Sequence, residues 1–119
     1  MIGRLYTVVI DCPDPAALAA FYAELLGLHA TRSEDDWVQL SDDSGPRVSF
    51  QKAPGLQPPR WPDPAYPQQF HLDVHVRDVD AAQARVLALG ARRLPGEGED
   101  FRVYADPVGH PFCLVWDTA

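Results

Sequence analysis

Side chains that can bind ligands or metal ions alternate along the segment QQFHLDVHVRDVDAA, residues 68–82. His71, Asp73 and His75 occupy every second position there, on the face where an ordinary strand would place apolar core residues. Imidazole and carboxylate groups can coordinate a metal ion or orient a polar ligand. The pattern therefore indicates a metal site, the lining of a ligand pocket, or a solvent-facing strand.

The spacing within this strand argues against a metal site built from the strand alone. Alternate residues of a strand lie ~6.6 Å apart, so His71 and His75 are separated by ~13 Å along the chain. A zinc-like ion needs its donor atoms ~2 Å away, and two imidazoles on one straight strand can scarcely converge on it. A chelate of His71 and Asp73 is less strained, but it needs further ligands from the other half of the chain.

The two halves of the chain are an imperfect repeat at a shift of 64 residues. TVVIDCPDPAALA, residues 7–19, then aligns with HLDVHVRDVDAAQ, residues 71–83. The same shift pairs Asp14 with Asp78, Trp37 with Phe101, Asp42 with Asp106, Gly45 with Gly109 and Ser49 with Cys113. A common shift from the first strand to the last turn predicts two copies of one structural module.

Each copy has the pattern of a strand, a helix and further short strands. Residues 4–12 alternate and predict a strand, and Asp14 with Pro15 is suited to begin a helix that ends at Gly27. Asp78 and Gly90 bound the equivalent helix. The apolar stripes of the two helices are Leu18, Phe21, Tyr22 and Leu25, and Val79, Ala82, Val86 and Leu89. WVQL and RVSFQ around DDSG, and FRVYA and PFCLVW around DPVG, predict the later strands.

A proline-rich segment, residues 53–69, connects the two copies and holds six of the 12 prolines. Proline removes backbone donors and fixes φ, which predicts an extended connector without helix or strand. Trp61 and Tyr66 are expected to anchor it across the module surface or against a second subunit, rather than to form a ligand lid. GEGED, residues 96–100, predicts a loop with solvated carboxylates.

One βαβββ unit of this size cannot bury its sheet face alone, so the two copies should pack together as a single domain. The predicted fold class is α+β, with two tandem βαβββ modules, residues 1–52 and 70–119, forming a curved mixed sheet with a central cleft. The residues expected to face the cleft are Thr7, Val9, Asp11, Ser49, Gln51, His71, Asp73, Cys113 and Val115, with His75 near the strand end and exposed. The residues expected to pack on the helices are Val8, Ile10, Phe50, Leu72, Val74 and Leu114.

The composition narrows the classes of partner. A net charge of −7 disfavours nucleic acid and anionic membranes, both of which attract basic faces. There is no apolar run of ~20 residues and no N-terminus of signal-peptide type, so we expect a cytoplasmic protein. Cys12 and Cys113 are expected to be free, packed thiols.

Three segments carry a resemblance to a known superfamily: DPAALAAFYAELLG, HLDVHVRDVDAA and YADPVGHPFCLV. The chain resembles the vicinal oxygen chelate superfamily, which includes glyoxalase I, bleomycin-resistance proteins and extradiol dioxygenases. It looks most like the small glyoxalase-like members common in actinobacteria. The resemblance implies the glyoxalase/bleomycin resistance fold and a homodimer.

The resemblance also implies where a metal would bind. Members that use a metal commonly draw His, Gln or Glu ligands from the first and last strands of each half. Those places correspond here to Thr7, Ser49, His71 and Cys113. Only His71 keeps the expected type, and Cys113 stands where Glu is usual, so the resemblance does not supply the full ligand set.

Three functions remain open. The first is a small-molecule binder of metabolites or drugs, without a cofactor, whose site comprises Thr7, Asp11, Trp37, Ser49, His71, Asp73 and Cys113. Aromatic side chains that could stack on a planar ligand are Trp37, Tyr66, Phe101 and Tyr104, although Phe101 is expected in the core. The alternative is a divalent-metal-dependent lyase, isomerase or dioxygenase with His71 as the anchor ligand, completed by Cys113, Asp73 or Asp11. The third is a structural or partner-binding module.

Overall fold

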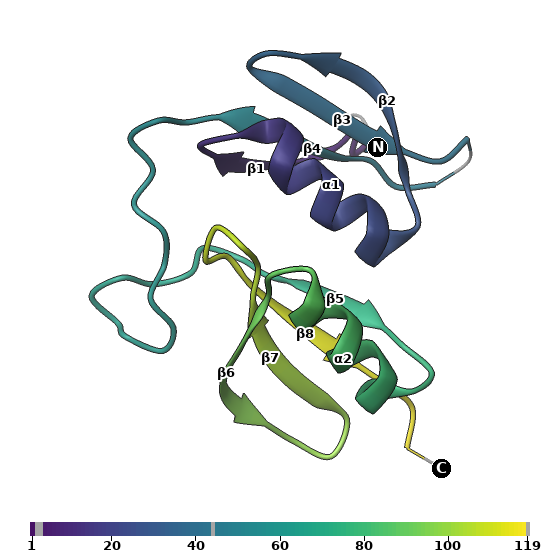
Figure 1. Cartoon of the computed structure of the whole chain (residues 1–119), viewed down its shortest axis with the longest axis vertical. Helices are drawn as coiled ribbons and strands as arrows, with labels where there is room; N and C mark the ends of the chain where they lie inside the picture. The colour runs from purple at the N-terminus through teal and green to yellow at the C-terminus, as the bar shows by residue number, and fades with distance from the viewer. Residues whose placement is uncertain (2–3, 44, 119) are drawn as a thin grey trace. The chain divides into compact units, whose positions relative to one another are not determined.

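The chain forms two compact units in the computed structural model, which describes Met1, residues 4–43 and residues 45–118. The first unit is Met1–Leu56 and the second is Gln57–Ala119 (Figure 1). Each unit contains one helix and one four-stranded sheet. Among the described residues, no helix is long and apolar enough to cross a membrane.

The first unit is a βαβββ module. Its elements are β1 (Val8–Cys12), α1 (Pro15–Leu26), β2 (His29–Glu34), β3 (Trp37–Ser41) and β4 (Val48–Lys52). The strand order is β1-β4-β3-β2. β1 runs parallel to β4, while β3 is antiparallel to both of its neighbours. The helix between β1 and β2 supplies the crossover that a parallel pair requires.

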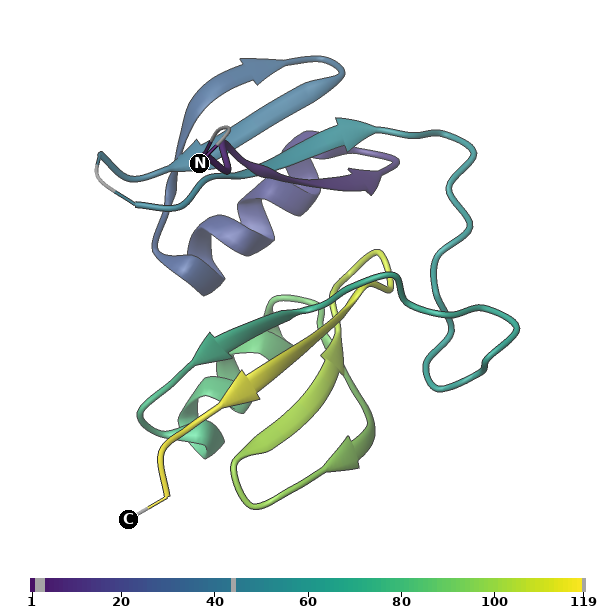
Figure 2. The same ribbon diagram turned by 180° about the vertical axis from the view of Figure 1, so that it is seen from behind.

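The second unit repeats this topology. Its elements are β5 (Leu72–His75), α2 (Val79–Ala88), β6 (Arg92–Glu97), β7 (Phe101–Ala105) and β8 (Pro111–Val115). The strand order is β5-β8-β7-β6, and β5 runs parallel to β8 (Figure 2). β3 and β7 occupy positions that differ by the shift of 64 residues throughout. The predicted α+β fold of two βαβββ modules is therefore confirmed.

Both helices begin at the predicted aspartates. The Oδ1 atom of Asp14 accepts a hydrogen bond from the Ala17 amide at 3.3 Å, and that of Asp78 accepts one from the Ala81 amide at 3.1 Å. These bonds satisfy amide protons of the first helical turn that have no partner within the helix. At its other end, α1 stops at Gly27, whose φ of 68° lies in the left-handed region.

Each N-cap is expected to contribute similarly to stability. Because Asp14 and Asp78 accept the same bond in equivalent positions, Asp14→Ala and Asp78→Ala should each lower the free energy of unfolding by about 1 kcal/mol. Urea denaturation of both variants measures this, with Asp14→Asn and Asp78→Asn as controls that retain a capping oxygen. Alanine variants as stable as the wild type would contradict the capping role.

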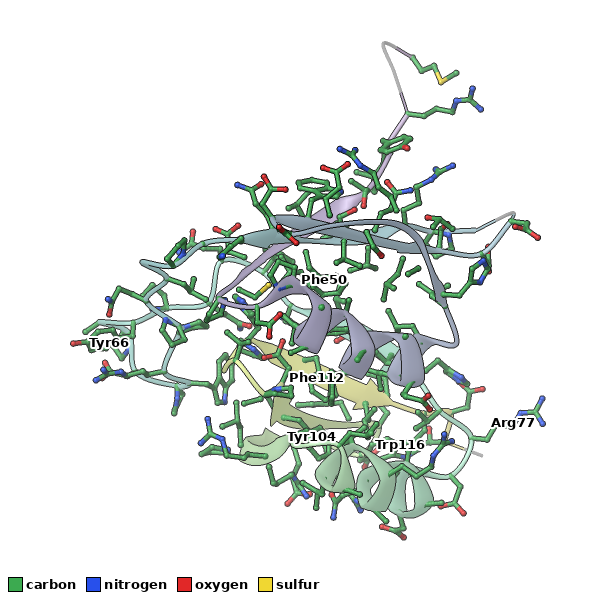
Figure 3. The ribbon with its side chains drawn as sticks, turned by 45° about the horizontal axis from the view of Figure 1, so that its top comes forward. Phe50, Tyr66, Arg77, Tyr104, Phe112 and Trp116 are labelled. Atoms are coloured by element: carbon green, nitrogen blue, oxygen red, sulfur yellow. The ribbon has the colours of Figure 1, made fainter. Side chains whose placement is uncertain are left out.

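The core of each unit lies on the sheet face that packs against the helix. In the first unit the rings of Tyr22 on α1 and Phe50 on β4 lie 5.4 Å apart (Figure 3). In the second unit Tyr104 stacks on Phe112 at 5.5 Å, and its hydroxyl donates to the Gln83 side chain on α2 at 2.6 Å. Of the residues predicted to pack on the helices, Ile10, Phe50 and Leu114 are buried, and Val8, Leu72 and Val74 are half-buried.

The edge strands depart from the sequence predictions. The predicted strand 4–12 is too long, because β1 begins at Val8 and Leu5 is 83% exposed before it. No strand is predicted at β2, where all six side chains are exposed and no alternation exists to be read. The predicted loop 96–100 is also wrong in part, since β6 continues through Gly96 and Glu97.

The connector, residues 53–69, contains turns but no helix or strand, as its prolines predict. It is attached to the second sheet: the Trp61 indole N–H donates to the Pro95 carbonyl at 2.6 Å. It also passes close to the turn before β8, where a Cβ atom on Gly109 would lie 3.2 Å from the Pro58 Cβ. Gly109 has a φ of 114°, so both backbone conformation and space require glycine there.

Candidate functional site

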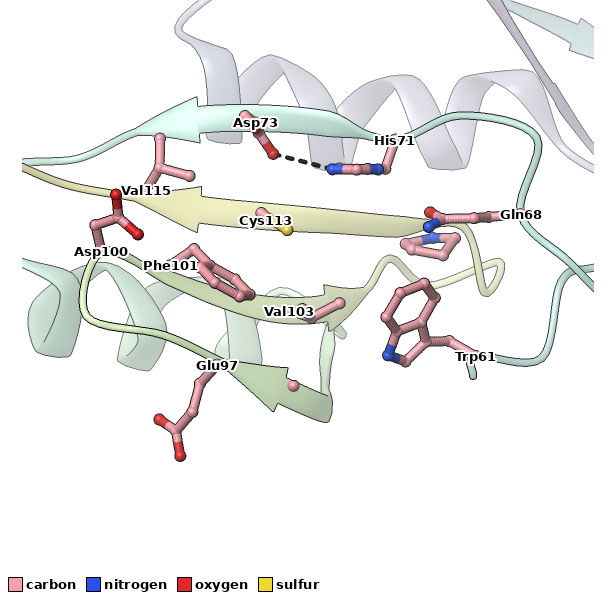
Figure 4. A pocket seen from close by; sticks show the side chains of 12 residues that line it. Trp61, Gln68, His71, Asp73, Glu97, Asp100, Phe101, Val103, Cys113 and Val115 are labelled. Carbon is pink, nitrogen blue, oxygen red and sulfur yellow. Dashed lines mark ion pairs between the residues drawn. The ribbon is translucent and has the colours of Figure 1, made fainter. Parts of the chain in front are cut away.

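The second unit carries a cavity of about 540 Å³ on the sheet face opposite α2 (Figure 4). Phe101 and Val103 of β7 and Cys113 and Val115 of β8 form its floor. The sheet register pairs Phe101 with Val115 and Val103 with Cys113, so these side chains share one face. The intervening residues, Arg102, Tyr104, Phe112 and Leu114, point to the helix side. This volume lies within the range that accommodates small organic ligands.

His71, Asp73 and Cys113 meet within this cavity. The His71 Nε2 atom lies 3.2 Å from the Asp73 Oδ1 atom, and Asp73 is the register partner of Cys113 on the parallel strand β8. One donor atom from each residue lies within 4.8 Å of the other two. His71 and Asp73 keep 39% and 58% of their side-chain surface exposed, so a ligand can reach both. All three residues come from one unit rather than from both halves of the chain.

The Cys113 thiol is not poised to act as a nucleophile. Burial, followed by the charge of Asp73 and a hydrogen bond to it, raises the pKa of Cys113 from 9.0 to about 11. The thiol is therefore protonated at neutral pH, and the protonated form neither attacks electrophiles nor binds metal strongly. This agrees with the expectation of a packed thiol, and both cysteines are free.

Alkylation should reveal this suppressed reactivity. A pKa of about 11 in place of 9.0 leaves about 100-fold less thiolate at pH 7.5. The reaction of Cys113 with iodoacetamide should be correspondingly slow and should accelerate as the pH rises towards 11. Intact-mass analysis of a Cys12→Ala variant measures Cys113 alone, and the same variant unfolded in urea is the control. Rapid alkylation of the folded variant at pH 7.5 would contradict a protonated thiol.

Aromatic and apolar side chains form the walls of the cavity. Trp61 reaches it from the connector, and its indole is fixed by the bond to the Pro95 carbonyl. Pro111 lies beside Trp61 at the same end, while Phe101 and Val115 lie towards the opposite end (Figure 4). Trp61 thus serves both to hold the connector on the sheet and to enclose the cavity.

Three further polar residues border the cavity, and they differ in their partners. The Gln68 Oε1 atom is buried and has no hydrogen-bond partner among the described residues. The Asp100 side chain likewise has no hydrogen bond or ion pair within residues 4–43 and 45–118. The Glu97 carboxylate is paired with Arg93 at 3.2 Å and points away from the cavity (Figure 4).

The remaining predicted site residues belong to the first unit. Thr7 Oγ1 and Ser49 Oγ lie 2.8 Å apart, so these two hydroxyls satisfy one another. Asp11 and Trp37 are both register partners of Gln51, on either side of β4. The structure therefore brings the seven predicted residues together as two groups on equivalent sheet faces, one group in each unit.

Several other predicted roles can be compared with the structure. Tyr104 is fully buried against Phe112 and cannot stack on a ligand, which corrects that expectation. Phe101 lines the cavity and is only half-buried, so its predicted core position is wrong. Tyr66 packs against the Arg60 guanidinium at 4.2 Å and lies outside the cavity. His75 is exposed, as predicted, and lies 3.1 Å from Asp117.

Trp61, Gln68 and Asp100 are cavity residues that the sequence reasoning did not assign to the site. The repeat offered no signal for Trp61 and Gln68, because the connector has no counterpart in the first copy. Phe101 did have a signal, since the shift aligns it with Trp37, which was assigned to the site. Its alternation with Arg102 and Val103 also places it on the face of Cys113.

Comparison with known proteins identifies the family. Residues 7–115 match the glyoxalase-like domain family, so the chain belongs to this family of the vicinal oxygen chelate superfamily. The match extends from the strand before α1 to the end of β8 and thus includes both modules. No match is found among curated proteins.

Solved structures with the same fold are similar over nearly their whole length. One is a glyoxalase/bleomycin resistance protein/dioxygenase family enzyme from Burkholderia phytofirmans, with a TM-score of 0.75, 21% identity, and coverage of 96% of this chain and 98% of that one. Another is a fosfomycin resistance protein from Listeria monocytogenes, with a TM-score of 0.73, 18% identity, and coverage of 99% and 96%. A third is a glyoxalase family protein from Enterococcus faecalis, with a TM-score of 0.70, 21% identity, and coverage of 96% and 98%. At these identities the similarity shows the fold.

Proposed function

We propose that this protein binds a small organic molecule in the cavity of its second unit and does so without the complete metal-ligand set of its superfamily. The observation that carries the proposal is the cavity itself. It combines an aromatic and apolar wall with a few polar side chains, His71 and Asp73 among them. This combination is typical of small-molecule sites, where apolar surface supplies affinity and polar groups orient the ligand.

The chemistry of the four expected ligand positions supports binding without a metal. Thr7 and Ser49 are poor metal ligands as neutral hydroxyls, and they are hydrogen-bonded to each other. Cys113 holds its proton at neutral pH. Only His71 offers an available donor of the usual type. The similarity to a fosfomycin resistance protein also supports a small-molecule ligand.

Calorimetric titration with a broad panel of metabolites and planar antibiotics tests the proposal. A Val115→Trp variant should fill the cavity and abolish binding, because Val115 lines it. Leu87→Trp, at an exposed position on α2, is the matched control and should bind as the wild type does. The proposal fails if no member of the panel saturates, or if Val115→Trp binds unchanged.

The cluster of His71, Asp73 and Cys113 favours a second candidate, a divalent-metal-dependent lyase, isomerase or dioxygenase. The donors fit a borderline ion such as zinc, which takes nitrogen at ~2.0 Å, sulfur at ~2.3 Å and carboxylate oxygen at similar distances. His71 and Asp73 are already 3.2 Å apart, and small side-chain rotations would bring the sulfur in. When bound, the ion would polarise oxygen atoms of a substrate. Binding through Cys113 must also displace the thiol proton.

Metal analysis of protein purified without chelators distinguishes the two candidates. The metal-dependent candidate requires about one ion per chain and its loss in His71→Ala. His75→Ala is the matched control, since His75 lies on the same strand but outside the cluster. Metal content far below one ion per chain, unchanged by His71→Ala, would eliminate this candidate and leave metal-independent binding.

We further propose that the protein is a homodimer, as the superfamily resemblance implies. Leu5, Tyr6 and Phe70 support this, because these large apolar side chains are 83%, 61% and 52% exposed. Apolar surface of this kind favours association. Sedimentation equilibrium at micromolar concentration provides the test, and a mass equal to one chain throughout would refute the dimer.

A further inference from the structure

The polar groups that border the cavity are predominantly hydrogen-bond acceptors. They include the Gln68 Oε1 atom, which is buried without a partner, and the carboxylates of Asp73 and Asp100. Burying an acceptor without a partner costs free energy, so the Gln68 oxygen indicates that a ligand donates to it. A ligand suited to this cavity therefore carries several N–H or O–H donors.

The charge of the lining has one sign. None of the 12 residues that line the cavity is Lys or Arg, whereas three are Asp or Glu. Glu97 is neutralised by Arg93 outside the cavity. Asp100 has no ion pair among the described residues, and Asp73 lies close only to His71 and the Cys113 thiol. An anionic ligand would be repelled by these carboxylates, and a cationic ligand would be attracted.

The aromatic side chains add a preference for shape. Trp61 and Phe101 stand towards opposite ends of the cavity (Figure 4). The indole N–H of Trp61 is already donated to the Pro95 carbonyl, so the ring offers its apolar surface rather than a hydrogen bond. Aromatic faces attract both flat rings and cations. Gly96 leaves room at the Trp61 end, where a Cβ atom would lie 3.9 Å from the indole nitrogen.

We propose that the ligand is a planar organic cation, an aromatic ring bearing a protonated amine or amidine. Its ring packs against Trp61 or Phe101, and its charged N–H groups donate to Asp73, Asp100 or the Gln68 oxygen. This inference rests on the proposed small-molecule site and names the class of molecule that the site selects.

Three indole probes of nearly equal size test the charge preference. Tryptamine is cationic, indole-3-ethanol is neutral and indole-3-propionate is anionic. Calorimetry should show tryptamine binding about tenfold or more tighter than indole-3-ethanol, with no measurable binding of indole-3-propionate. Val115→Trp should abolish the binding of tryptamine, which assigns it to the cavity.

Variants identify the groups that recognise the charge. Asp100→Asn and Asp73→Asn should each reduce the preference for tryptamine over indole-3-ethanol by about three- to tenfold. Asp117→Asn changes the net charge by the same amount at a side chain that is 91% exposed and outside the cavity, and it should leave the preference unchanged. An equal effect of all three substitutions would show non-specific attraction and overturn the proposal.

The outcomes separate this inference from the proposed function. If neutral or anionic molecules of the wider panel bind in the wild type and lose binding in Val115→Trp, while tryptamine shows no advantage over indole-3-ethanol, the charge preference is wrong and the small-molecule site stands. If no molecule binds in a way that Val115→Trp blocks, both proposals fail.

Discussion

Replacing Asp106 by alanine is expected to lower the free energy of unfolding by about 3 kcal/mol or more. Asp106 is 1% exposed, and its Oδ1 atom accepts hydrogen bonds from the amides of Val108, Gly109 and His110 at 2.9–3.0 Å. Alanine removes this acceptor and leaves amide groups of the turn without a partner in a buried place. The turn positions β8, which carries Cys113, so the cavity floor should also be disturbed.

Urea denaturation of Asp106→Ala measures the loss. Asp106→Asn is nearly isosteric and keeps one acceptor oxygen, so it should lose less than half as much. Asp42→Ala is the matched control at the equivalent position of the first unit; because Asp42 is exposed, we expect a cost of at most about 1 kcal/mol. Equal losses at positions 42 and 106 would show that the hydrogen bonds of the buried turn are not decisive.

The second large effect is expected for Phe112→Ala, at about 3–5 kcal/mol. Phe112 is fully buried at the centre of the second sheet and stacks on Tyr104 at 5.5 Å. Its removal loses the transfer free energy of the ring and leaves a cavity that the sheet and α2 can fill only in part. The variant should therefore unfold at a much lower urea concentration than the wild type.

Phe101→Ala is the control that separates core packing from the lining of the cavity. Phe101 has the same chemistry on a neighbouring strand, but it faces the cavity and is half-buried. It should cost about 1 kcal/mol in stability, because it buries less surface. Its main effect should be on ligand affinity. A stability loss at Phe101 as large as that at Phe112 would mean that Phe101 belongs to the core after all.

The repeat makes the difference between the two modules informative. Equivalent positions hold Thr7 and Ser49 in the first unit and His71 and Cys113 in the second. In the first unit the two hydroxyls bond to each other, whereas in the second the imidazole and thiol lie near Asp73 beside an open cavity. The two copies thus share a backbone and differ in chemistry, which is why we place the ligand in the second unit.

Much of the fold could be predicted because its determinants are local in the sequence. Asp14 and Asp78 cap helices through amides three residues away, and Gly27 ends α1 through its own φ. Alternation assigned Phe50 and Leu114 to the helix side and Cys113 to the other. Such patterns require only the period of a helix or strand, which neighbouring residues already express.

The edge strands could not be predicted in the same way. β2 has every side chain exposed, so it is held by backbone bonds to β3 rather than by a buried face. β6 includes Pro95 and Gly96, residues that disfavour strands, and its pairing with β7 has an irregular register. Pairing with a neighbouring strand overrides local preference in both cases.

The sequence by itself determined the duplicated module, its helix boundaries, the two faces of each sheet and the presence of His71, Asp73 and Cys113 on one of those faces. Only the tertiary structure decided that these three side chains meet within one unit, that Phe101 faces a cavity, and that Trp61 and Gln68 enclose it. The physical reason is range: periodicity is a property of adjacent residues, whereas the cavity depends on parallel pairing of β5 with β8 and on a connector that docks through a single bond from Trp61 to Pro95.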